Sequence, residues 1–318
     1  MASIFERANN PVHIHFLHDK TLTACNRSLL CETAEIFGQR IIFYDVAHHV
    51  GHIGNDGVQL VQKTFSAGSL FRLLMPAILP LDKVLYLDSD VVVNMDIKEL
   101  WDIPLEAHSL AAVRDRSFTT DCERHPVKAF KVKQMGCDWK NYVNSGVLLM
   151  NLPRIRHKFD LIQQSHLWFK RNKHLASFPD QDLINSCFRG DIKFIEEKFN
   201  FCGHAHDADI NAAYIFHAMG PKPWAELRHS VKNRLYWRAF FKTAWGRLKP
   251  EEIVDLLIDI AEKSPHTHKR TTQCYRTVFY RLLRGVFYNR FIRNIIFSVK
   301  FLYHEMKYIL TREKSEAI

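Results

Sequence analysis

The chain of 318 residues lacks the marks of a secreted, disulfide-bonded or membrane-spanning protein. Its seven cysteines are scattered without a Cys-x-x-Cys pair, so the sequence indicates neither a structural zinc site nor a disulfide framework. The first residues show no basic segment followed by an apolar one, and nowhere do about 18 uncharged apolar residues run together. We therefore expect no secretion signal, no spanning helix and a reducing, cytoplasmic setting.

Acidic residues are fewer than basic ones, and part of the chain has none. The totals are 34 Asp and Glu against 44 Lys and Arg, a formal net charge of +10. No acid occurs between residues 263 and 304, where arginines interleave with aromatic and aliphatic residues. This pattern predicts one or two basic amphipathic helices that bind an anionic membrane surface. Without an RNA-binding or helix-turn-helix signature, nucleic acid is not an expected partner.

Hydrophobic residues make up 47% of the chain, enough for a full-sized core, and they recur in short β-branched runs. Runs of this kind alternate with segments of helical spacing, which predicts an α/β fold with a largely parallel sheet. The expected strands lie at 12–18, 41–46, 83–88, 109–115, 143–151 and 192–197, and the expected helices at 21–37, 66–79, 153–172 and 180–189. In such sheets ligands bind at the carboxyl ends of the strands, and Asp88 lies at one of these ends.

The segment KVLYLDSDVVV, residues 83–93, places two acids between apolar runs. Asp88 and Asp90 occupy alternate positions, so on an extended chain they point the same way and repel each other unless a cation lies between them. Two other interpretations remain open. The acids could simply end a strand, or they could form the nucleophile loop of a magnesium-dependent haloacid-dehalogenase-like phosphatase. No matching downstream acidic pair is present, which makes the phosphatase the second choice.

Four further segments accompany the two acids, one before them in the chain and three after them. They are SLFRLLMPAILP (69–80), YVNSGVLLMNL (142–152), FPDQDLIN (178–185) and FHAMGPKPW (216–224). With these five motifs, residues 1–245 resemble the retaining glycosyltransferases of family eight, above all bacterial lipopolysaccharide and surface-polysaccharide galactosyl- and glucosyltransferases. The resemblance implies a GT-A type fold, with a mostly parallel Rossmann-like nucleotide-sugar-binding sheet in a catalytic domain (1–245), followed by a basic helical extension (246–318).

The same resemblance implies a metal site and a phosphate site. Asp88, Asp90 and His217 would hold Mn²⁺ or Mg²⁺, and the imidazole favours Mn²⁺, the softer ion. Gly220 and Lys222 would bind the donor diphosphate. The family usually has H-x-x-G-x-x-K-P-W, and this chain has one residue fewer between Gly and Lys.

Other matching positions would contact the donor sugar. The resemblance assigns Arg72, Asp115, Asn144 and Asp180 to donor binding. It places Gln181 beside the reacting carbon. Two mechanisms stay open: transient attack by Gln181 or the adjacent Asp182, or front-face transfer in which the leaving phosphate deprotonates the acceptor hydroxyl.

The expected reaction is therefore retaining transfer of a hexose, galactose or glucose, from a UDP-sugar to a lipid-linked saccharide. The enzyme would be peripheral, on the cytoplasmic face of the membrane. The alternatives are the phosphatase and an inactive basic membrane-associated protein.

The family normally opens with a strand and turn that contact the nucleotide base and ribose. In this sequence MASIFERANN resembles the helix that follows, so the run at 12–18 corresponds to the family's second strand. A sheet without its first strand exposes backbone groups and loses base contacts. We therefore expect weak or undetectable UDP binding by these 318 residues.

Overall fold

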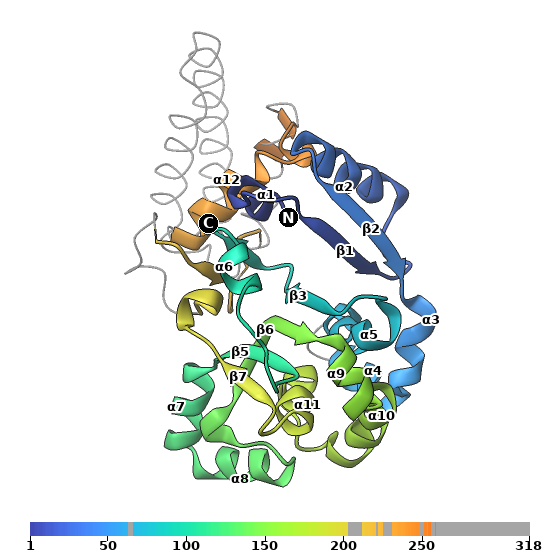
Figure 1. The fold of residues 1–318 in the computed structure, drawn as a ribbon, viewed down its shortest axis with the longest axis vertical. Coiled ribbons are helices and arrows are strands. Elements are labelled where there is room, and N and C mark those ends of the chain that lie inside the picture. Colours follow the sequence, from blue (N-terminus) through green and yellow to red (C-terminus); the bar gives the residue numbers. More distant parts are fainter. Residues whose placement is uncertain are drawn as a thin grey trace, which may run out of the picture. The chain divides into compact units, whose positions relative to one another are not determined.

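The protein is represented by a computed structural model (Figure 1). It describes residues 1–62, 66–202, 212–220, 222–224 and 231–247, with 251, 252, 254, 255 and 258. The chain divides into two units, Met1–Leu256 and Leu257–Ile318. Nearly all described residues belong to the first unit, and the expected membrane-binding segment at 263–304 lies outside the described residues. The proposed domain boundary at residue 245 stays a prediction.

The chain begins with a helix and a two-stranded parallel sheet. Helix α1 (Ala2–Arg7) precedes strand β1 (His13–His18), and helix α2 (Ala24–Ile36) connects β1 to β2 (Arg40–Asp45). Thr23 precedes α2 and its hydroxyl accepts a hydrogen bond from the backbone N–H of Asn26, 3.2 Å away, which satisfies one of the free donors of the first turn. The strands pair in register, with His13 opposite Arg40 and His18 opposite Asp45.

A four-stranded sheet forms the centre of the first unit. Its order is β3 (Lys83–Leu87), β6 (Val143–Asn151), β5 (Leu110–Arg114) and β7 (Ile192–Phe194). Strand β6 runs antiparallel to both β3 and β5, and β5 runs parallel to β7. A third pair, β4 (Val91–Val93) and β8 (Ile215–His217), is antiparallel.

The α/β class is thus confirmed, but the expectation of mostly parallel strands needs correction. Among the described strands three pairs are antiparallel, β3–β6, β5–β6 and β4–β8, and two are parallel, β1–β2 and β5–β7. A strand buried on both faces is apolar at successive positions whichever way its neighbours run. The apolar runs therefore located the strands without revealing their direction.

Helices cover the sheet. In chain order they are α3 (Ala47–Val50), α4 (Asn55–Gln62), α5 (Phe71–Ile78), α6 (Lys98–Trp101), α7 (Arg116–Arg124), α8 (Pro126–Gln134), α9 (Leu152–Lys158), α10 (Leu161–Asn172), α11 (Pro179–Cys187) and α12 (Val231–Phe240). The single helix expected at 153–172 is two helices, because Phe159 is extended and Asp160 begins a new one. The carboxylate of Asp160 accepts from the N–H of Gln163 at 3.0 Å, a helix cap in mid-segment.

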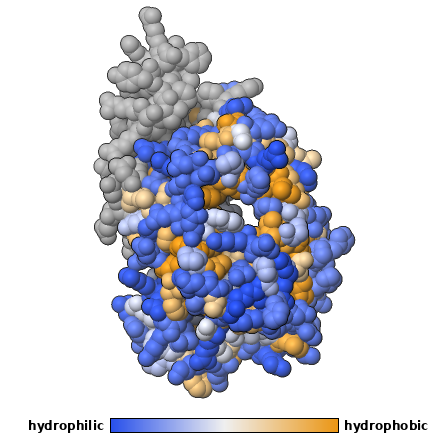
Figure 2. Space-filling model, in the orientation of Figure 1, coloured by the Kyte–Doolittle hydropathy of each residue, from blue (hydrophilic) through white to orange (hydrophobic). Residues whose placement is uncertain are grey.

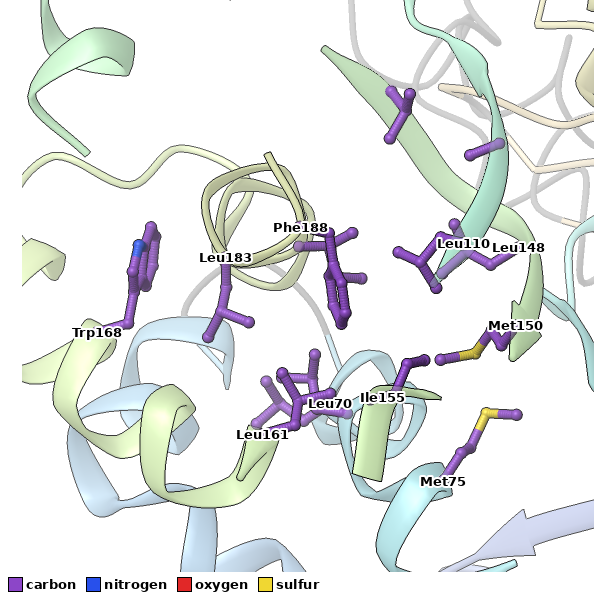
Figure 3. Packing of buried hydrophobic residues seen from close by; sticks show 14 of the residues in the cluster. Leu70, Met75, Leu110, Leu148, Met150, Ile155, Leu161, Trp168, Leu183 and Phe188 are labelled. Atoms are coloured by element: carbon purple, nitrogen blue, oxygen red, sulfur yellow. The ribbon is translucent and has the colours of Figure 1, made fainter. Parts of the chain in front are cut away.

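The main core lies between the central sheet and the helices α5, α9, α10 and α11 (Figure 3). The labelled side chains come from these elements or from residues directly next to them, and they include Met75, Leu148, Ile155, Leu161 and Phe188. Leu148 is fully buried and Phe188 is 1% exposed. Each such side chain contributes about 1.5–3 kcal/mol. This packing holds the ends of β3 and β6 and the start of α11, where the predicted site residues lie.

Two findings on the described residues concern cysteines and membrane-spanning helices. The six cysteines in this part of the chain are free thiols. No helix within the described ranges has both the length and the apolar character needed to cross a membrane.

Candidate active site

The two acids and the predicted histidine meet because two short strands pair next to the central sheet. Asp88 follows β3, and its N–H donates to the carbonyl of Gly146 on β6 at 2.8 Å. Asp90 directly precedes β4, and the β4–β8 pairing places Val91 opposite His217. One possible ligand atom from each of Asp88, Asp90 and His217 lies within 4.8 Å of the others. The predicted three-residue group is therefore assembled.

Each carboxylate is fixed through one oxygen, and its other oxygen faces His217. Oδ1 of Asp88 accepts from Nη2 of Arg72 at 2.7 Å and from the hydroxyl of Tyr86 at 2.5 Å. Oδ2 of Asp90 pairs with the ammonium of Lys222. The remaining oxygens, Oδ2 of Asp88 and Oδ1 of Asp90, lie 3.8 and 3.4 Å from Nε2 of His217. Two carboxylate oxygens and one imidazole nitrogen thus face a common position.

The His217 ring is oriented by a contact on the nitrogen opposite the acids. Its Nδ1 lies 3.0 Å from Oδ1 of Asn200, so Nε2 is the nitrogen that faces the acids. A second residue sets the distance: a Cβ on Gly146 would lie 2.2 Å from Cε1 of His217 and 2.9 Å from Oδ2 of Asp88. Only glycine lets β6 come this close. An outer hydrogen bond that orients a histidine is the usual support of a metal ligand.

The charges of the group suit a divalent cation. Burial raises the pKa of Asp90, but hydrogen bonds and charges from His217 and Lys222 outweigh it and lower the pKa to about 2. Asp90 is therefore ionised at neutral pH. Hard carboxylate oxygens with one imidazole are ligands that Mn²⁺ and Mg²⁺ accept. We conclude that the residues present fit a divalent metal ion.

Next to the acids lies a cavity of about 1790 Å³. It is lined by every predicted site residue except Asp182, namely Arg72, Asp88, Asp90, Asp115, Asn144, Asp180, Gln181, His217, Gly220 and Lys222. Six of them line the cavity although they are less than 8% exposed, namely Arg72, Asp115, Asn144, Asp180, Gln181 and His217. Buried polar groups at a cavity wall are typical of a site that binds a polar ligand.

Hydrogen bonds connect these wall residues. Oε1 of Gln181 accepts from the N–H of Ser145 at 3.0 Å, and its Nε2 lies 3.4 Å from Oδ2 of Asp115. Nδ2 of Asn144 lies 3.4 Å from the same Asp115 oxygen. Oδ1 of Asn144 accepts from Asn200 at 2.8 Å. The positions expected to bind the sugar and the residue that holds His217 therefore form one network.

Arg72 is a buried member of the site, and it is not a solvated helix residue. It is 4% exposed and donates from Nη1 to the carbonyl of Ser145 at 2.6 Å. Its Nε lies 3.4 Å from Oδ2 of Asp180. Burial lowers the pKa of Arg72, but the charges of Tyr86, Asp88 and Asp180 outweigh it and raise the pKa overall. The pKa of Asp180 is raised by burial, against the opposing effect of Arg72.

Asp182 does not line the cavity, and its carboxylate holds the residues that precede α11. It is fully buried, its Oδ2 accepts from the N–H groups of Ser177 and Phe178 at 2.9 Å each, and its Oδ1 accepts from the hydroxyl of Tyr142 at 2.6 Å. Burial raises its pKa to about 6. Every oxygen that Asp182 offers is engaged in the structure of the chain itself.

Sequence reasoning missed four residues of the site. Tyr86 could have been found, because it lies two positions before Asp88 and so on the same side of the strand. Ser145 and Gly146 lie beside Asn144 in a motif that had already been identified. Asn200 carries no signal in the sequence, since its role depends on a fold contact with His217 across 17 residues.

Comparison with known proteins gives the family. The model described as "Glycosyl transferase family 8" matches residues 1–228. A putative glycosyltransferase of Haemophilus influenzae is 29% identical over 198 residues, which are 61% of this chain and 56% of that protein. Glycosyltransferase GlyB of Streptococcus pneumoniae is 25% identical over 191 residues, 55% of this chain and 42% of that protein. The chain thus spans about half the length of these relatives.

Solved structures share the fold. The galactosyltransferase LgtC, in complex with donor and acceptor sugar analogs, aligns with a TM-score of 0.58 and 24% identity, covering 77% of this chain and 100% of that one. The bifunctional glycosyltransferase WbbM aligns with a TM-score of 0.62 and 20% identity over 83% of this chain and 48% of that one. These likenesses show a GT-A type fold, and no finding supports the phosphatase alternative. By its family match over residues 1–228, the chain belongs to glycosyl transferase family 8.

Proposed function

We propose that the protein is a metal-dependent retaining hexosyltransferase. It moves galactose or glucose from a UDP-sugar to a lipid-linked saccharide in lipopolysaccharide or surface-polysaccharide synthesis, at the cytoplasmic membrane face. One observation carries the proposal: Asp88, Asp90 and His217 present free ligand atoms to one point at the edge of a cavity walled by buried polar side chains. A site for a divalent ion next to a site for sugar hydroxyls suits a nucleotide-sugar donor.

In this proposal the donor diphosphate lies beside the metal ligands. A bound Mn²⁺ or Mg²⁺ would neutralise charge that develops on the leaving diphosphate. Lys222 is already at this place despite the shortened motif, since its ammonium contacts Asp90 and also donates to the carbonyl of Ala218 at 3.0 Å. Gly220 has φ 81°, a backbone conformation that favours glycine and lets the chain approach phosphate closely.

The sugar would bind at the polar wall. Asp115, Asn144 and Asp180 offer carboxylate and amide groups to hydroxyls, and Arg72 fixes Asp180. Gln181 stands at the same wall with its Oε1 already accepting from the Ser145 N–H. An amide oxygen engaged in this way is a poor nucleophile, and Asp182 faces the other side of α11. The arrangement supports front-face transfer, with Gln181 as a positioning residue, over a covalent intermediate.

The test is incubation with a panel of UDP-sugars in the presence of Mn²⁺ or Mg²⁺, following UDP release and sugar transfer. Asp90→Ala should abolish both activities, because it removes a ligand oxygen and leaves His217 and Lys222 without their shared partner. The matched control is Glu123→Ala, which removes a carboxylate from the exposed surface of α7. Unchanged turnover in folded Asp90→Ala would overturn the metal-dependent proposal, and absence of UDP release with every donor would favour the inactive membrane-associated alternative.

A further inference from the structure

Helix α8 carries the most exposed large hydrophobic side chains of the described residues. Val127 is 70% exposed and Phe130 is 60% exposed, and no other large hydrophobic residue in the described ranges exceeds 43%. The two residues are three positions apart on one helix, so they are neighbours on its surface. Single exposed apolar residues are ordinary on a protein surface, whereas an adjacent pair as exposed as this one indicates contact with something apolar.

Lysines lie on both sides of this apolar pair. At about 100° per residue, Lys131 lies next to Val127 on one side of the outward face, and Lys133 lies next to Phe130 on the other. Both lysines are exposed, and Val132 between them is buried against the core. The segment PVKAFKVKQ that forms α8 contains three lysines and no acid. The outward face of α8 is therefore apolar in the middle and basic at its margins.

The inward side of α8 belongs to the wall of the cavity. Lys128 lines the cavity, its Nζ donates to Oδ2 of Asp121 on α7 at 3.0 Å, and it lies 4.3 Å from the centre of the Phe118 ring. Asp121 and Phe118 line the same cavity. Figure 1 shows α7 and α8 side by side at one end of the unit, and Figure 2 shows the hollow of the cavity. Whatever contacts the outward face of α8 thus lies beside the cavity.

The chemistry of this outward face fits an anionic lipid bilayer better than a protein partner. Apolar side chains flanked by lysines are typical of helices that lie in a membrane interface, where the apolar groups enter the boundary of the acyl chains and the lysines meet lipid phosphates. Lysine is depleted at protein–protein interfaces. The net charge of +10 adds a general attraction to an anionic surface.

We propose that the outward face of α8 is a membrane-docking surface for an anionic bilayer. This α8 docking surface consists of Val127, Phe130, Lys131 and Lys133. It is separate from the basic segment at 263–304, which lies outside the described residues. The inference rests on the proposed function in one respect, the lipid-linked acceptor. Docking through α8 places one wall of the cavity next to the lipid surface, so the saccharide of such an acceptor reaches the cavity while its lipid stays in the bilayer.

The first test measures how strongly the full chain partitions onto vesicles of phosphatidylcholine and phosphatidylserine. Val127→Ser combined with Phe130→Ser should lower the partition coefficient about tenfold or more, because two apolar side chains no longer enter the interface. Lys131→Ala with Lys133→Ala should lower it about fivefold for each lysine on these vesicles and leave it unchanged on phosphatidylcholine alone. The matched control is Leu167→Ser, which removes a 43% exposed leucine from α10 and should change nothing.

A second measurement identifies what α8 touches, even if residues 263–304 supply most of the affinity for the vesicles. The photoreactive aromatic residue p-benzoylphenylalanine replaces Phe130 in the full chain, and it replaces Leu167 in the control. After irradiation with the same vesicles, mass spectrometry should find lipid adducts at position 130 and none above background at position 167. Adducts of this kind support the proposal whether or not the partition coefficient changes. Circular dichroism melts establish that all variants fold.

Three results would overturn the proposal. The first is no lipid adduct at position 130, and the second is an equal yield of adducts at positions 130 and 167, which would mean contact without a preferred face. The third is a crosslink from position 130 to a second copy of the chain in place of lipid, which would make α8 an interface between copies. UDP release measured without vesicles should be the same in the wild type and in the protein with both serines. A wild type that releases no UDP therefore refutes the proposed function and leaves the vesicle results standing.

Discussion

Gly146→Ala provides the sharpest test of the proposed metal site of Asp88, Asp90 and His217, because it adds one methyl group at a known distance from the His217 ring. The new Cβ would lie 2.2 Å from Cε1 of His217, whereas ordinary contact begins at 3.4 Å. The ring must therefore move by at least 3.4 − 2.2, or about 1.2 Å. Metal–ligand distances tolerate about 0.2 Å. The backbone of His217 cannot follow, since β8 is paired with β4 opposite Val91.

The expected result is weaker metal binding in a folded protein. Loss of support around a ligating histidine usually costs about 10–100-fold in affinity. Mn²⁺ titration followed by electron paramagnetic resonance of the free ion, with calorimetry as a second method, measures this directly. Gly51→Ala is the control, because a Cβ there meets nothing within 4 Å and the backbone has no positive φ. A far-UV circular dichroism melt establishes that both variants fold.

Unchanged Mn²⁺ affinity in folded Gly146→Ala would refute this reasoning. If the variant does not fold, Asn200→Ala tests the same point without crowding, because it releases Nδ1 of His217 from its partner 3.0 Å away and also removes the hydrogen bond to Oδ1 of Asn144. It should weaken Mn²⁺ binding by about tenfold or more. Wild-type affinity in that variant would contradict the orienting role of Asn200.

Three other predictions concern α11 and the basic segment. Gln181→Ala should lower kcat more than it raises the KM for the donor, because Gln181 lies beside the proposed reacting carbon; equal effects would make it a donor-binding residue only. Asp182→Asn should keep activity. The pKa of the wild-type carboxyl is raised from 3.8 to about 6 in the folded state, so the unfolded chain releases this proton at lower pH, and the wild type loses about 3 kcal/mol of unfolding free energy relative to the variant between about pH 4 and pH 7, as measured by urea unfolding. Loss of turnover with unchanged stability would instead support a nucleophile. A chain ending at Lys263 should sediment less with anionic phosphatidylserine vesicles than the full chain, each lost cation costing about 1 kcal/mol, and equal sedimentation would rule out the anchor.

Much of the fold could be read from apolar runs, because burial on a strand leaves a local pattern. The predicted strand at 143–151 coincides with β6, and the helix at 21–37 contains α2. The direction of pairing could not be read, since β6 is buried at every residue but its last whichever way its neighbours run, and it is antiparallel to both of them. The division between α9 and α10 could not be read either. The spacing of apolar residues continues across it, and only the hydrogen bond from the Gln163 N–H to Asp160 shows that a new helix begins there.

The sequence predicted many residues of the site even though they are far apart in the chain. Asp88 and His217 are far apart in the chain, and only the order of motifs in the family connected them before the β4–β8 pairing brought them together. What remained hidden was the support of these side chains. Asn200 acts through a 3.0 Å contact with His217, and Gly146 acts by leaving room for the His217 ring, and both effects arise only in the folded chain. A sequence pattern reports residue types, and it does not report which residues contact and position the predicted ligands in the folded chain.

Arg72 connects the buried polar groups of the site and fixes their positions relative to one another. One guanidinium donates to Asp88, lies beside Asp180 and binds the carbonyl of Ser145, whose N–H in turn holds Gln181. A buried charge that satisfies several acceptors at once fixes them relative to one another, because moving any one leaves an unpaired polar group in a low-dielectric interior. Asp88, the proposed metal ligand, and Gln181, which we propose lies beside the sugar, are therefore set at a constant separation before a donor binds. Such preorganisation is what transfer between two bound substrates requires, since the reacting atoms must meet without rearrangement of the wall.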